Sequence, residues 1–190
     1  MSDDAESLAR LVRATPWLMR ALHAARALGL ASWCIGAGAV RELAWDALHG
    51  RPTPAPGADL DLVFFDPDPA HACAACEHAL AARLREAEPA FDWEVVNQAG
   101  PHHAFAQALA RGRAAHASLA EAIATWPETA TCVGVFLDGD DALQVVAPLG
   151  LRDLLAGIVR FNPACGDAAI FEERVARKRF AERWPRLVRA

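Results

Sequence analysis

The stretch DLDLVFF, at residues 59–65, decides the fold of this chain. Its apolar side chains at positions 60, 62 and 64 share one face of a strand expected over residues 60–65, and Asp59 and Asp61 share the other. The apolar run after Asp61 indicates that the strand enters the core. The alternative, an exposed sheet edge that merely bears two charges, fits that run less well.

Asp59 and Asp61 point the same way because they are two residues apart on a strand. Neighbouring carboxylates repel each other, which raises the free-energy cost of ionising both, and a bound divalent cation removes that cost. Mg²⁺ is commonly held by one or two carboxylates and completes its shell with water and phosphate oxygens. The pair is therefore a candidate Mg²⁺ site.

A glycine-containing turn precedes this strand, in the segment CIGAGAVR at residues 34–41. A short strand leads into Gly36, Ala37 and Gly38, and a helix follows. Small residues let a ligand approach the backbone, and a helix N-terminus offers unpaired N–H groups that attract phosphate. The segment is a candidate phosphate site, although the same pattern also occurs in tight turns that bind nothing.

The segment FDWEVVNQ, at residues 91–98, supplies further acids. Asp92 and Glu94 share one face of a strand expected over residues 91–96. Either carboxylate joins the Asp59 and Asp61 pair if the two strands are neighbours. On their own, the two acids are more typical of a solvated strand face.

The remaining pattern alternates strands with helices and ends in a hairpin and further helices. Strands are expected at 32–35, 60–65, 91–96, 131–137 and 143–146, and helices at 16–28, 40–48, 70–87, 118–125, 151–159 and 168–183. Breaks fall where proline, glycine or aspartate cluster, at 49–57, 99–101, 137–141 and 162–166. This order predicts an α+β or α/β domain built on a mixed sheet flanked by helices.

Composition and charge narrow the function classes. The 190 residues are 54% hydrophobic and 23% charged, as in ordinary globular proteins, and predict one domain over 1–190, with a core at about 16–150 and a basic helical segment at 151–190. The formal net charge is −5, divided into −9 over residues 1–151 and +4 over 152–190. Non-specific DNA binding is not expected, because it needs a basic face. An acidic body with a basic tail suits a divalent cation and its phosphates, although both halves are also compatible with plain solvated surface.

Neither a membrane span nor a secretory leader is expected. No window offers 18 uninterrupted apolar residues, and the opening residues MSDDAESLAR lack a basic and an apolar region. The five scattered cysteines are expected to be reduced thiols, so we expect a cytoplasmic protein.

Two cysteines and two histidines in residues 70–87 invite a metal interpretation: His71, Cys73, Cys76 and His78. Cys-x-x-Cys is a zinc-ligand spacing. However, the segment is expected to form one continuous helix without a second ligand pair nearby. The favoured interpretation is that Cys73, Cys76 and Leu80 lie on a buried helix face.

Taken together, these segments resemble the polymerase-beta-type nucleotidyltransferases, which combine a glycine turn, an Asp-x-Asp pair and a third acid on a following strand. More narrowly, the chain resembles a bacterial nucleotidyltransferase family. The matching strings are GAGAVR at 36–41, WDALHG at 45–50, DLD at 59–61, NQA at 97–99, WPETAT at 126–131, VGV at 133–135, APLGL at 147–151, VRFNP at 159–163, RVARK at 174–178 and WP at 184–185.

The resemblance implies a Mg²⁺-dependent (or Mn²⁺-dependent) transfer of a nucleoside monophosphate from an NTP to an acceptor. Asp59 and Asp61 would hold the metal with Glu94 or, failing it, Asp92. The turn Gly36, Ala37 and Gly38 would carry phosphates. Four basic residues are candidates to neutralise the triphosphate, each with a surface salt bridge as its alternative: Arg41, Arg160, Arg174 and Lys178.

The chain also departs from the family pattern. Ala37 removes a hydroxyl that many relatives offer to a phosphate, and a proline-rich loop lengthens the segment before Asp59. Asn97, Gln98 and His102 are expected to position substrate, but Gly-Pro-His at 100–102 replaces the Arg-Met-His of the family, and Arg111 or Arg113 would have to supply the missing charge.

The function expected is therefore a nucleotidyltransferase whose acceptor is a protein, an RNA or a small molecule. The alternative is a non-catalytic nucleotide-binding relative with a regulatory or interaction role. A protein-interaction module without nucleotide affinity is the third possibility.

Overall fold

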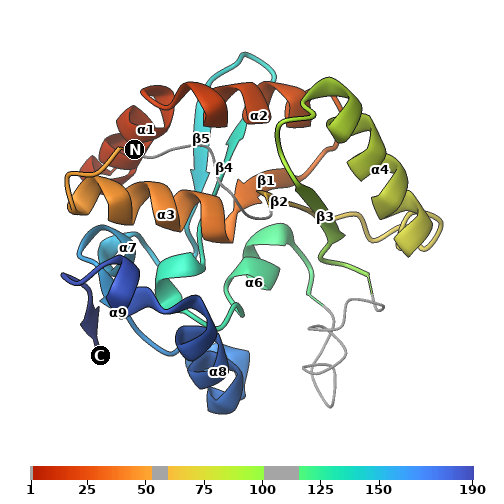
Figure 1. Cartoon of the computed structure of the whole chain (residues 1–190). Helices are drawn as coiled ribbons and strands as arrows, with labels where there is room; N and C mark the ends of the chain where they lie inside the picture. The colour runs from red at the N-terminus through yellow and green to blue at the C-terminus, as the bar shows by residue number, and fades with distance from the viewer. Residues whose placement is uncertain (1, 53–59, 101–115) are drawn as a thin grey trace.

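The computed structural model describes residues 2–52, 60–100 and 116–190. Its centre is a five-stranded mixed sheet in the order β3-β2-β1-β4-β5 (Figure 1). The strands are β1 (Trp33–Gly36), β2 (Leu60–Phe64), β3 (Trp93–Asn97), β4 (Gly134–Leu137) and β5 (Leu143–Val146). Strand β1 is antiparallel to both β2 and β4, β4 is antiparallel to β5, and β2 is parallel to β3. The predicted mixed sheet flanked by helices is confirmed.

Four helices cover one face of the sheet and bury the main core against it. They are α1 (Asp3–Arg13), α2 (Pro16–Arg26), α3 (Ala37–Leu48) and α4 (Ala74–Ala87). Strand β2 contributes its even-numbered residues Leu60, Leu62 and Phe64 to this core, each at most 2% exposed. Because side chains alternate along a strand, the side chain of Asp61 lies on the other face of the sheet.

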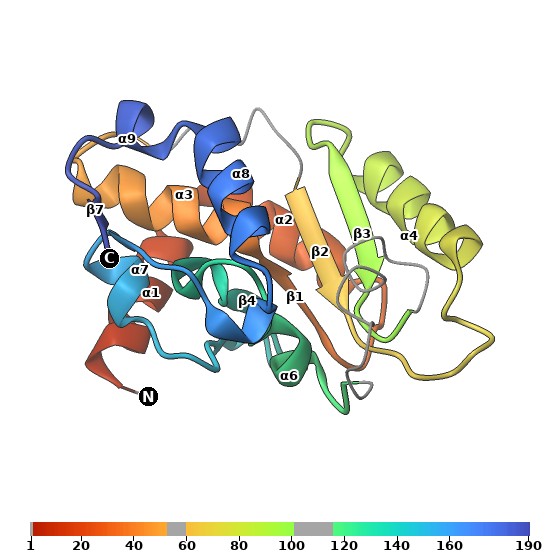
Figure 2. The ribbon, with the colours of Figure 1, turned by 90° about the horizontal axis from the view of Figure 1, so that it is seen from below.

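A smaller cluster covers part of that second face. It combines Val63 and Val96 from the sheet with Leu119 and Ile123 of α6 (Leu119–Ile123) and with Trp126. Seen from below, α6 and α8 (Ala168–Lys178) flank β2 and β3 on this side (Figure 2). The second face is thus covered only in part by helices.

The C-terminal segment differs from the prediction. The helix expected at 151–159 is a short helix, α7 (Arg152–Leu155), followed by a strand, β6 (Ile158–Val159), that pairs in parallel with β7 (Val188–Arg189). Gly157 separates them: its φ is +68°, and an added Cβ would lie 2.6 Å from Leu48 Cδ2. The 3₁₀ turns η1 (Thr129–Thr131) and η2 (Pro163–Cys165) complete this part.

The helix expected at 168–183 is also interrupted. Arg179 adopts a left-handed backbone with φ 49°, so α8 ends at Lys178 and α9 (Phe180–Arg183) starts a new direction. The change of direction seats Phe180 and Trp184 against Trp45 of α3, with ring centroids 5.2 and 5.3 Å from that of Trp45. The C-terminal helices are thereby packed on α3.

Two differences concern the helices on the first face. The sequence did not predict α1, although Ser2 caps it by accepting a hydrogen bond from Ala5 N and acidic residues occupy its first turn. The helix expected at 70–87 begins at Ala74, and Cys73 is its N-cap. Cys73 and Cys76 are half-buried, so the prediction that they lie on a buried helix face is wrong.

None of the helices in the described part of the chain is long and apolar enough to cross a membrane.

Candidate active site

A cavity of about 390 Å³ opens on the second face of the sheet, where helices leave β2 and β3 uncovered. Its floor is the sheet, one wall is the segment that contains Trp126 and Pro127, and the opposite wall is α8. The residues that line it are Ala37, Asp61, Val63, Glu94, Val96, Gln98, Trp126, Pro127, Thr131, Ile170, Glu173, Arg174 and Arg177. Asp61 and Glu94 therefore lie on the floor, and Arg174 and Arg177 lie with Glu173 on the helix that faces it.

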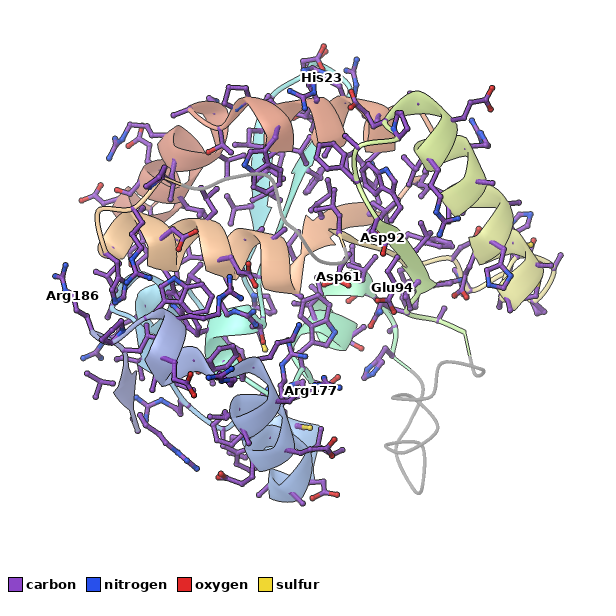
Figure 3. All side chains as sticks on the ribbon, viewed as in Figure 1. His23, Asp61, Asp92, Glu94, Arg177 and Arg186 are labelled. Carbon is purple, nitrogen blue, oxygen red and sulfur yellow. The ribbon has the colours of Figure 1, made fainter. Side chains whose placement is uncertain are left out.

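Asp61 and Glu94 are direct neighbours across the parallel strands β2 and β3. Paired strands lie about 4.8 Å apart, and paired residues point to the same face, so the two carboxylates stand side by side in the cavity (Figure 3). Asp92, the other candidate, precedes β3 and accepts a 2.7 Å backbone hydrogen bond from Leu60 N. Of these two acids, Glu94 is the one that lies opposite Asp61 and lines the cavity.

The glycine turn lies directly beside Asp61. A Cβ added to Gly38 would be 3.8 Å from Asp61 Oδ2, which shows that the backbone at the start of α3 is close to the carboxylate. A Cβ added to Gly36 would meet Trp126 at 3.0 Å and Val133 O at 3.1 Å, so a larger residue there would clash with the cavity wall. The turn therefore brings the N-terminus of a twelve-residue helix to the acids.

Ala37 occupies the centre of this turn with φ 46°, a left-handed conformation that costs an L-residue about 1–2 kcal/mol. Its N–H donates to Val133 O at 3.2 Å. Within the described residues, α3 has no side-chain cap hydrogen bond. The first-turn N–H groups that follow Ala37 thus carry the positive end of the helix dipole toward the cavity.

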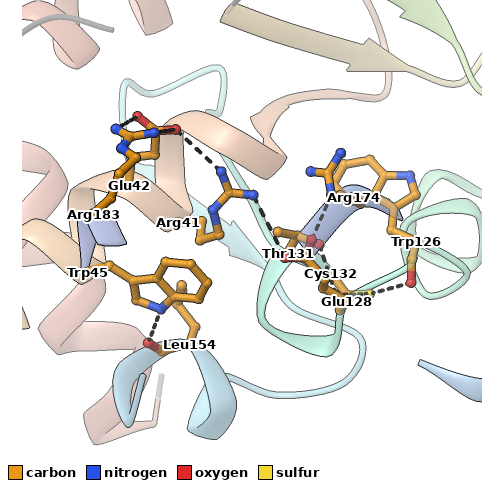
Figure 4. Close-up of polar contacts among 10 residues, drawn as sticks. All are labelled: Arg41, Glu42, Trp45, Trp126, Glu128, Thr131, Cys132, Leu154, Arg174 and Arg183. Carbon is orange, nitrogen blue, oxygen red and sulfur yellow. Dashed lines mark hydrogen bonds and ion pairs between the residues drawn. The ribbon is translucent and has the colours of Figure 1, made fainter. Parts of the chain in front are cut away.

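Arg174 reaches the cavity from α8 and is held by a buried acid. Its Nε donates to Glu128 Oε1 at 2.7 Å, and Glu128 is 0% exposed (Figure 4). The second oxygen, Glu128 Oε2, lies 3.8 Å from Nη1 of Arg41. Glu128 therefore sits between two guanidinium groups and fixes the one that lines the cavity.

Arg41, expected to bind phosphate, is completely buried instead of lining the cavity. Its guanidinium lies 4.7 Å from the ring centroid of Phe180 and 5.3 Å from that of Trp45. Within the described residues, Arg41 Nε, Arg41 Nη1 and Glu128 Oε2 have no hydrogen-bond partner. Burial lowers the pKa of Arg41, and the Glu128 carboxylate acts in the opposite direction. The arrangement assigns Arg41 to the support of Glu128.

The other two basic candidates stand apart from the cavity lining. Arg160 pairs with Asp153, Nε to Oδ2 at 2.9 Å, and is half-exposed. Lys178 is half-buried, and burial, together with Arg41 and Arg174 nearby, lowers its pKa. A lowered pKa fits a crowded cationic cluster that an anionic ligand would relieve.

The polar residues expected to position substrate have different surroundings. Gln98 lines the cavity and accepts a hydrogen bond of 3.4 Å from Trp126 Nε1. Asn97 is 0% exposed; its Nδ2 donates to Asp66 O at 2.9 Å, and its Oδ1 accepts from Asp66 N at 3.1 Å. Asn97 therefore ties the ends of β2 and β3 together. His102 and Asp59 lie outside the described residues.

The sequence analysis did not single out Arg177 or Glu128, although both matter to the site. Arg177 is one turn beyond Arg174 on α8 and points toward the acids from below in Figure 3. A helical period from Ile170 would have found it, because positions 170, 173, 174 and 177 share one face. Glu128 is the N-cap residue of the short turn η1, for which the sequence carries no comparable periodic signal.

The donor chemistry of the acids fits Mg²⁺ or Mn²⁺. Asp61 and Glu94 provide hard carboxylate oxygens, and two carboxylates are a usual protein share of a Mg²⁺ shell that substrate phosphates complete. In residues 2–52, 60–100 and 116–190 there is no group of three or more His, Cys, Asp or Glu placed to hold a metal. Like charges directly opposite each other are unfavourable, and a cation between them would relieve this repulsion.

Comparisons with known proteins agree with this fold. A family model described as nucleotidyltransferase matches residues 23–188. A solved structure described as an NMR structure that reveals a CCA-adding enzyme head domain is 28% identical, with a TM-score of 0.81, and the match covers 97% of this chain and 95% of that one. A search of the curated proteins found no match.

Two structures of tRNA-processing enzymes share the fold at lower similarity. The apo form I is 18% identical with a TM-score of 0.52, and the match covers 100% of this chain and 45% of that one. The enzyme complex 3 is 19% identical with a TM-score of 0.53, and the match covers 90% of this chain and 43% of that one. This chain therefore spans less than half the length of those enzymes.

Proposed function

We propose that this chain, which belongs to a nucleotidyltransferase family, transfers a nucleoside monophosphate from an NTP to an acceptor hydroxyl and releases pyrophosphate. The observation that carries the proposal is the direct opposition of Asp61 and Glu94 beside Gly38, across a cavity from Arg174 and Arg177. Acids that suit a divalent cation and arginines that suit its phosphates then face each other.

Asp61 and Glu94 would hold Mg²⁺ or Mn²⁺, and Asp59 joins them in the proposal because it is two residues from Asp61. The metal, when bound, would lower the pKa of the acceptor hydroxyl and offset the charge of the phosphates. Each of these carboxylates would act by binding the metal and so fixing the position of the phosphate oxygens around it.

The phosphates of the NTP would bind between the start of α3 and α8. The N–H groups from Gly38 onward face the anion, and Arg174 and Arg177 approach it from the other wall. Because Glu128 holds Arg174 before substrate arrives, little reorganisation is needed when negative charge develops. Trp126 supplies an apolar wall, which suits a nucleobase or a ribose.

In the chemical step, the acceptor oxygen attacks the α-phosphorus in line with the bond to the β-phosphate. An O–Pα bond forms, the Pα–O bond to pyrophosphate breaks, and the hydroxyl proton passes to a carboxylate such as Glu94 or to water. Arg174 and Arg177 would stabilise the charge that accumulates on the leaving pyrophosphate.

The acceptor is a protein, an RNA or a small molecule. An RNA 3′ end is the first to test, because the solved structure that is 28% identical is described as a CCA-adding enzyme head domain. The most direct experiment incubates the purified chain with α-labelled NTPs, Mg²⁺ or Mn²⁺, and separately a tRNA pool, a protein extract and small metabolites, and follows label transfer and pyrophosphate release.

Asp92 provides a matched control for this test. Asp61→Asn and Glu94→Gln should each reduce pyrophosphate release about 100-fold or more, because several kcal/mol of charge stabilisation are lost. Asp92→Asn, on the same strand segment but outside the cavity lining, should leave turnover within about twofold. Equal losses in all three variants would contradict the proposed site.

Ala37 gives one reason to test the non-catalytic alternative, a nucleotide-binding relative with a regulatory role. The turn lacks the hydroxyl that the family resemblance leads us to expect at this point. Metal-dependent NTP binding that Asp61→Asn abolishes, without pyrophosphate release on any acceptor, would favour this alternative over the transferase.

A further inference from the structure

Cys73 and Cys76 form a close pair of thiols at the start of α4, and neither of them lines the cavity that contains Asp61 and Glu94. Their sulfur atoms lie 3.0 Å apart. Cys73 is the N-cap of α4, and its sulfur accepts a hydrogen bond from Cys76 N at 3.4 Å. Both side chains are half-buried, so small molecules in solvent can reach them.

The remaining cysteines have a different environment. Cys34, Cys132 and Cys165 are each 0% exposed. Burial raises the pKa of Cys34, and it raises the pKa of Cys132 to about 12. A thiol that stays protonated and covered is a poor nucleophile. Of the five cysteines, only the pair in the first turn of α4 combines proximity with access.

Local hydrogen bonds differentiate the two thiols of the pair. The contact between the two sulfur atoms lowers the pKa of Cys73, and the hydrogen bond that Cys73 Sγ accepts from the N–H of Cys76 adds to this effect. The same contact raises the pKa of Cys76. The N-terminus of a fourteen-residue helix favours negative charge at Cys73 as well. Cys73 is therefore the natural attacking thiol, and Cys76 is the natural resolving thiol.

A zinc site is less consistent with the surroundings. His71 Nδ1 lies 2.8 Å from Asp66 Oδ2, so this histidine is engaged elsewhere. No group of three or more metal-ligating side chains occurs within the described ranges, which contain all four residues of the segment. Two thiols without further ligands suit redox chemistry better than a tetrahedral metal.

We propose that Cys73 and Cys76 form a reversible dithiol–disulfide site that reacts with low-molecular-weight disulfides. The Cys73 thiolate attacks one sulfur of the small disulfide RSSR, forming a Cys73–SR bond and releasing RS⁻. Cys76 then loses its proton to solvent and attacks Cys73 Sγ, which releases a second RS⁻. The protein loses two electrons and two protons, and RSSR is reduced to two RSH.

The turn of α4 that contains the pair also contacts the edge strand of the sheet. Glu77, next to Cys76 in α4, accepts a 2.7 Å hydrogen bond from Asn97 N at the end of β3. A disulfide would fix the first turn of α4, where this contact is made. The redox site and the cavity are thus connected through one strand end, but the disulfide itself does not depend on the proposed transferase activity.

The test equilibrates the full native chain with glutathione disulfide and reduced glutathione at several ratios, then blocks free thiols with a maleimide. Trypsin releases both cysteines in a single peptide, residues 42–83, because Arg51 precedes Pro52 and no other cysteine lies between. We expect this peptide to lose both reactive thiols and gain an internal disulfide that dithiothreitol reverses. The peptides with Cys34, Cys132 and Cys165 should stay reduced.

Two variants separate the roles of the thiols. Cys76→Ser should stop the reaction at one glutathione on Cys73, and Cys73→Ser should form an adduct at Cys76 at least tenfold more slowly. Circular dichroism checks that both variants fold. Absence of the internal disulfide at every glutathione ratio would overturn the proposal. So would a bound zinc ion in the purified protein that protects both thiols from maleimide.

Discussion

Glu128 accepts a 2.7 Å hydrogen bond from Nε of Arg174, so a fully buried carboxylate holds in place a guanidinium that lines the cavity. Arg41 lies on the other side of Glu128, 3.8 Å from Oε2, and is itself completely buried. Removing one member of such a group leaves another buried charge without compensation.

Glu128→Gln should therefore lower the free energy of unfolding by about 3 kcal/mol, because the buried charge of Arg41 would keep only its 3.3 Å contact with Glu42 as compensation. It should also weaken NTP binding, because Arg174 would lose its fixed position. Urea unfolding and nucleotide titration measure the two effects. Glu182→Gln, which breaks an exposed pair with Arg179, is the control and should change stability by less than about 0.5 kcal/mol. Equal stability of the two variants would refute the role of Glu128.

Arg177→Gln should raise the KM for NTP about tenfold, which corresponds to ~1.4 kcal/mol from one lost charged contact. Arg177 lines the cavity opposite the acids, whereas Arg186 lies at the left edge of the molecule in Figure 3, away from Asp61 and Glu94. Arg186→Gln is the matched control, since it removes the same charge, and its KM should stay at the wild-type value. If both variants change KM alike, a general charge effect would explain the result instead of a contact in the cavity.

Ala37→Gly should stabilise the protein by up to about 1 kcal/mol. The backbone at Ala37 has φ 46°, and relief of that strain, about 1–2 kcal/mol, exceeds the 0.5–1 kcal/mol of extra freedom that glycine gains in the unfolded chain. Ala39→Gly, in the regular part of the same helix, should instead destabilise by about 1 kcal/mol. Thermal unfolding of both variants checks the opposite signs, and destabilisation by Ala37→Gly would show that the turn is not strained.

Asp138 should make stability depend on pH at the β4–β5 turn. Hydrogen bonds from Gln144 and from Ala142 N lower the folded-state pKa of Asp138. The stabilisation is therefore fully present above the ordinary value, about 3.9, and is lost as the pH falls through the lowered folded-state pKa. Urea unfolding should show Asp138→Ala less stable than wild type at pH 7, with a difference that shrinks in acid. A difference that grows in acid would contradict the assigned direction.

The sequence predicted the elements that carry a strong hydrophobic period. The alternation in β2 located both its buried face and the face of Asp61. The helix after the glycine turn was expected over 40–48, and α3 starts earlier, at Ala37 within the turn. These features depend on neighbouring residues alone. The parallel pairing of β2 with β3 does not, so the sequence left Asp92 and Glu94 as alternatives until the register placed Glu94 opposite Asp61.

Other errors arose where a tertiary contact overrides a local pattern. Residues 151–159 have helical periodicity, but the contact of Gly157 with Leu48 and the pairing of Ile158 with Val188 divide the segment. The basic residues were the hardest to place. A charge pattern cannot distinguish an arginine that binds phosphate from one that pairs with a buried acid. Arg41 is of the second kind, and its partner Glu128 lies 87 positions away in the chain.

The pairing of β2 with β3 has a consequence for protein engineering. Shifting either strand by one position would move its apolar side chains to the solvent face, so the loss of stability alone excludes this shift. A shift of two positions would keep every apolar side chain inside yet move the carboxylates about 6.6 Å apart along the strands. The two hydrogen bonds between Asn97 and the backbone of Asp66 favour the observed register over this two-residue shift. Inserting or deleting two residues in either strand would therefore keep the apolar faces packed, but it would separate the carboxylates and break the buried contacts of Asn97, so a redesigned strand needs an activity assay beside its stability screen.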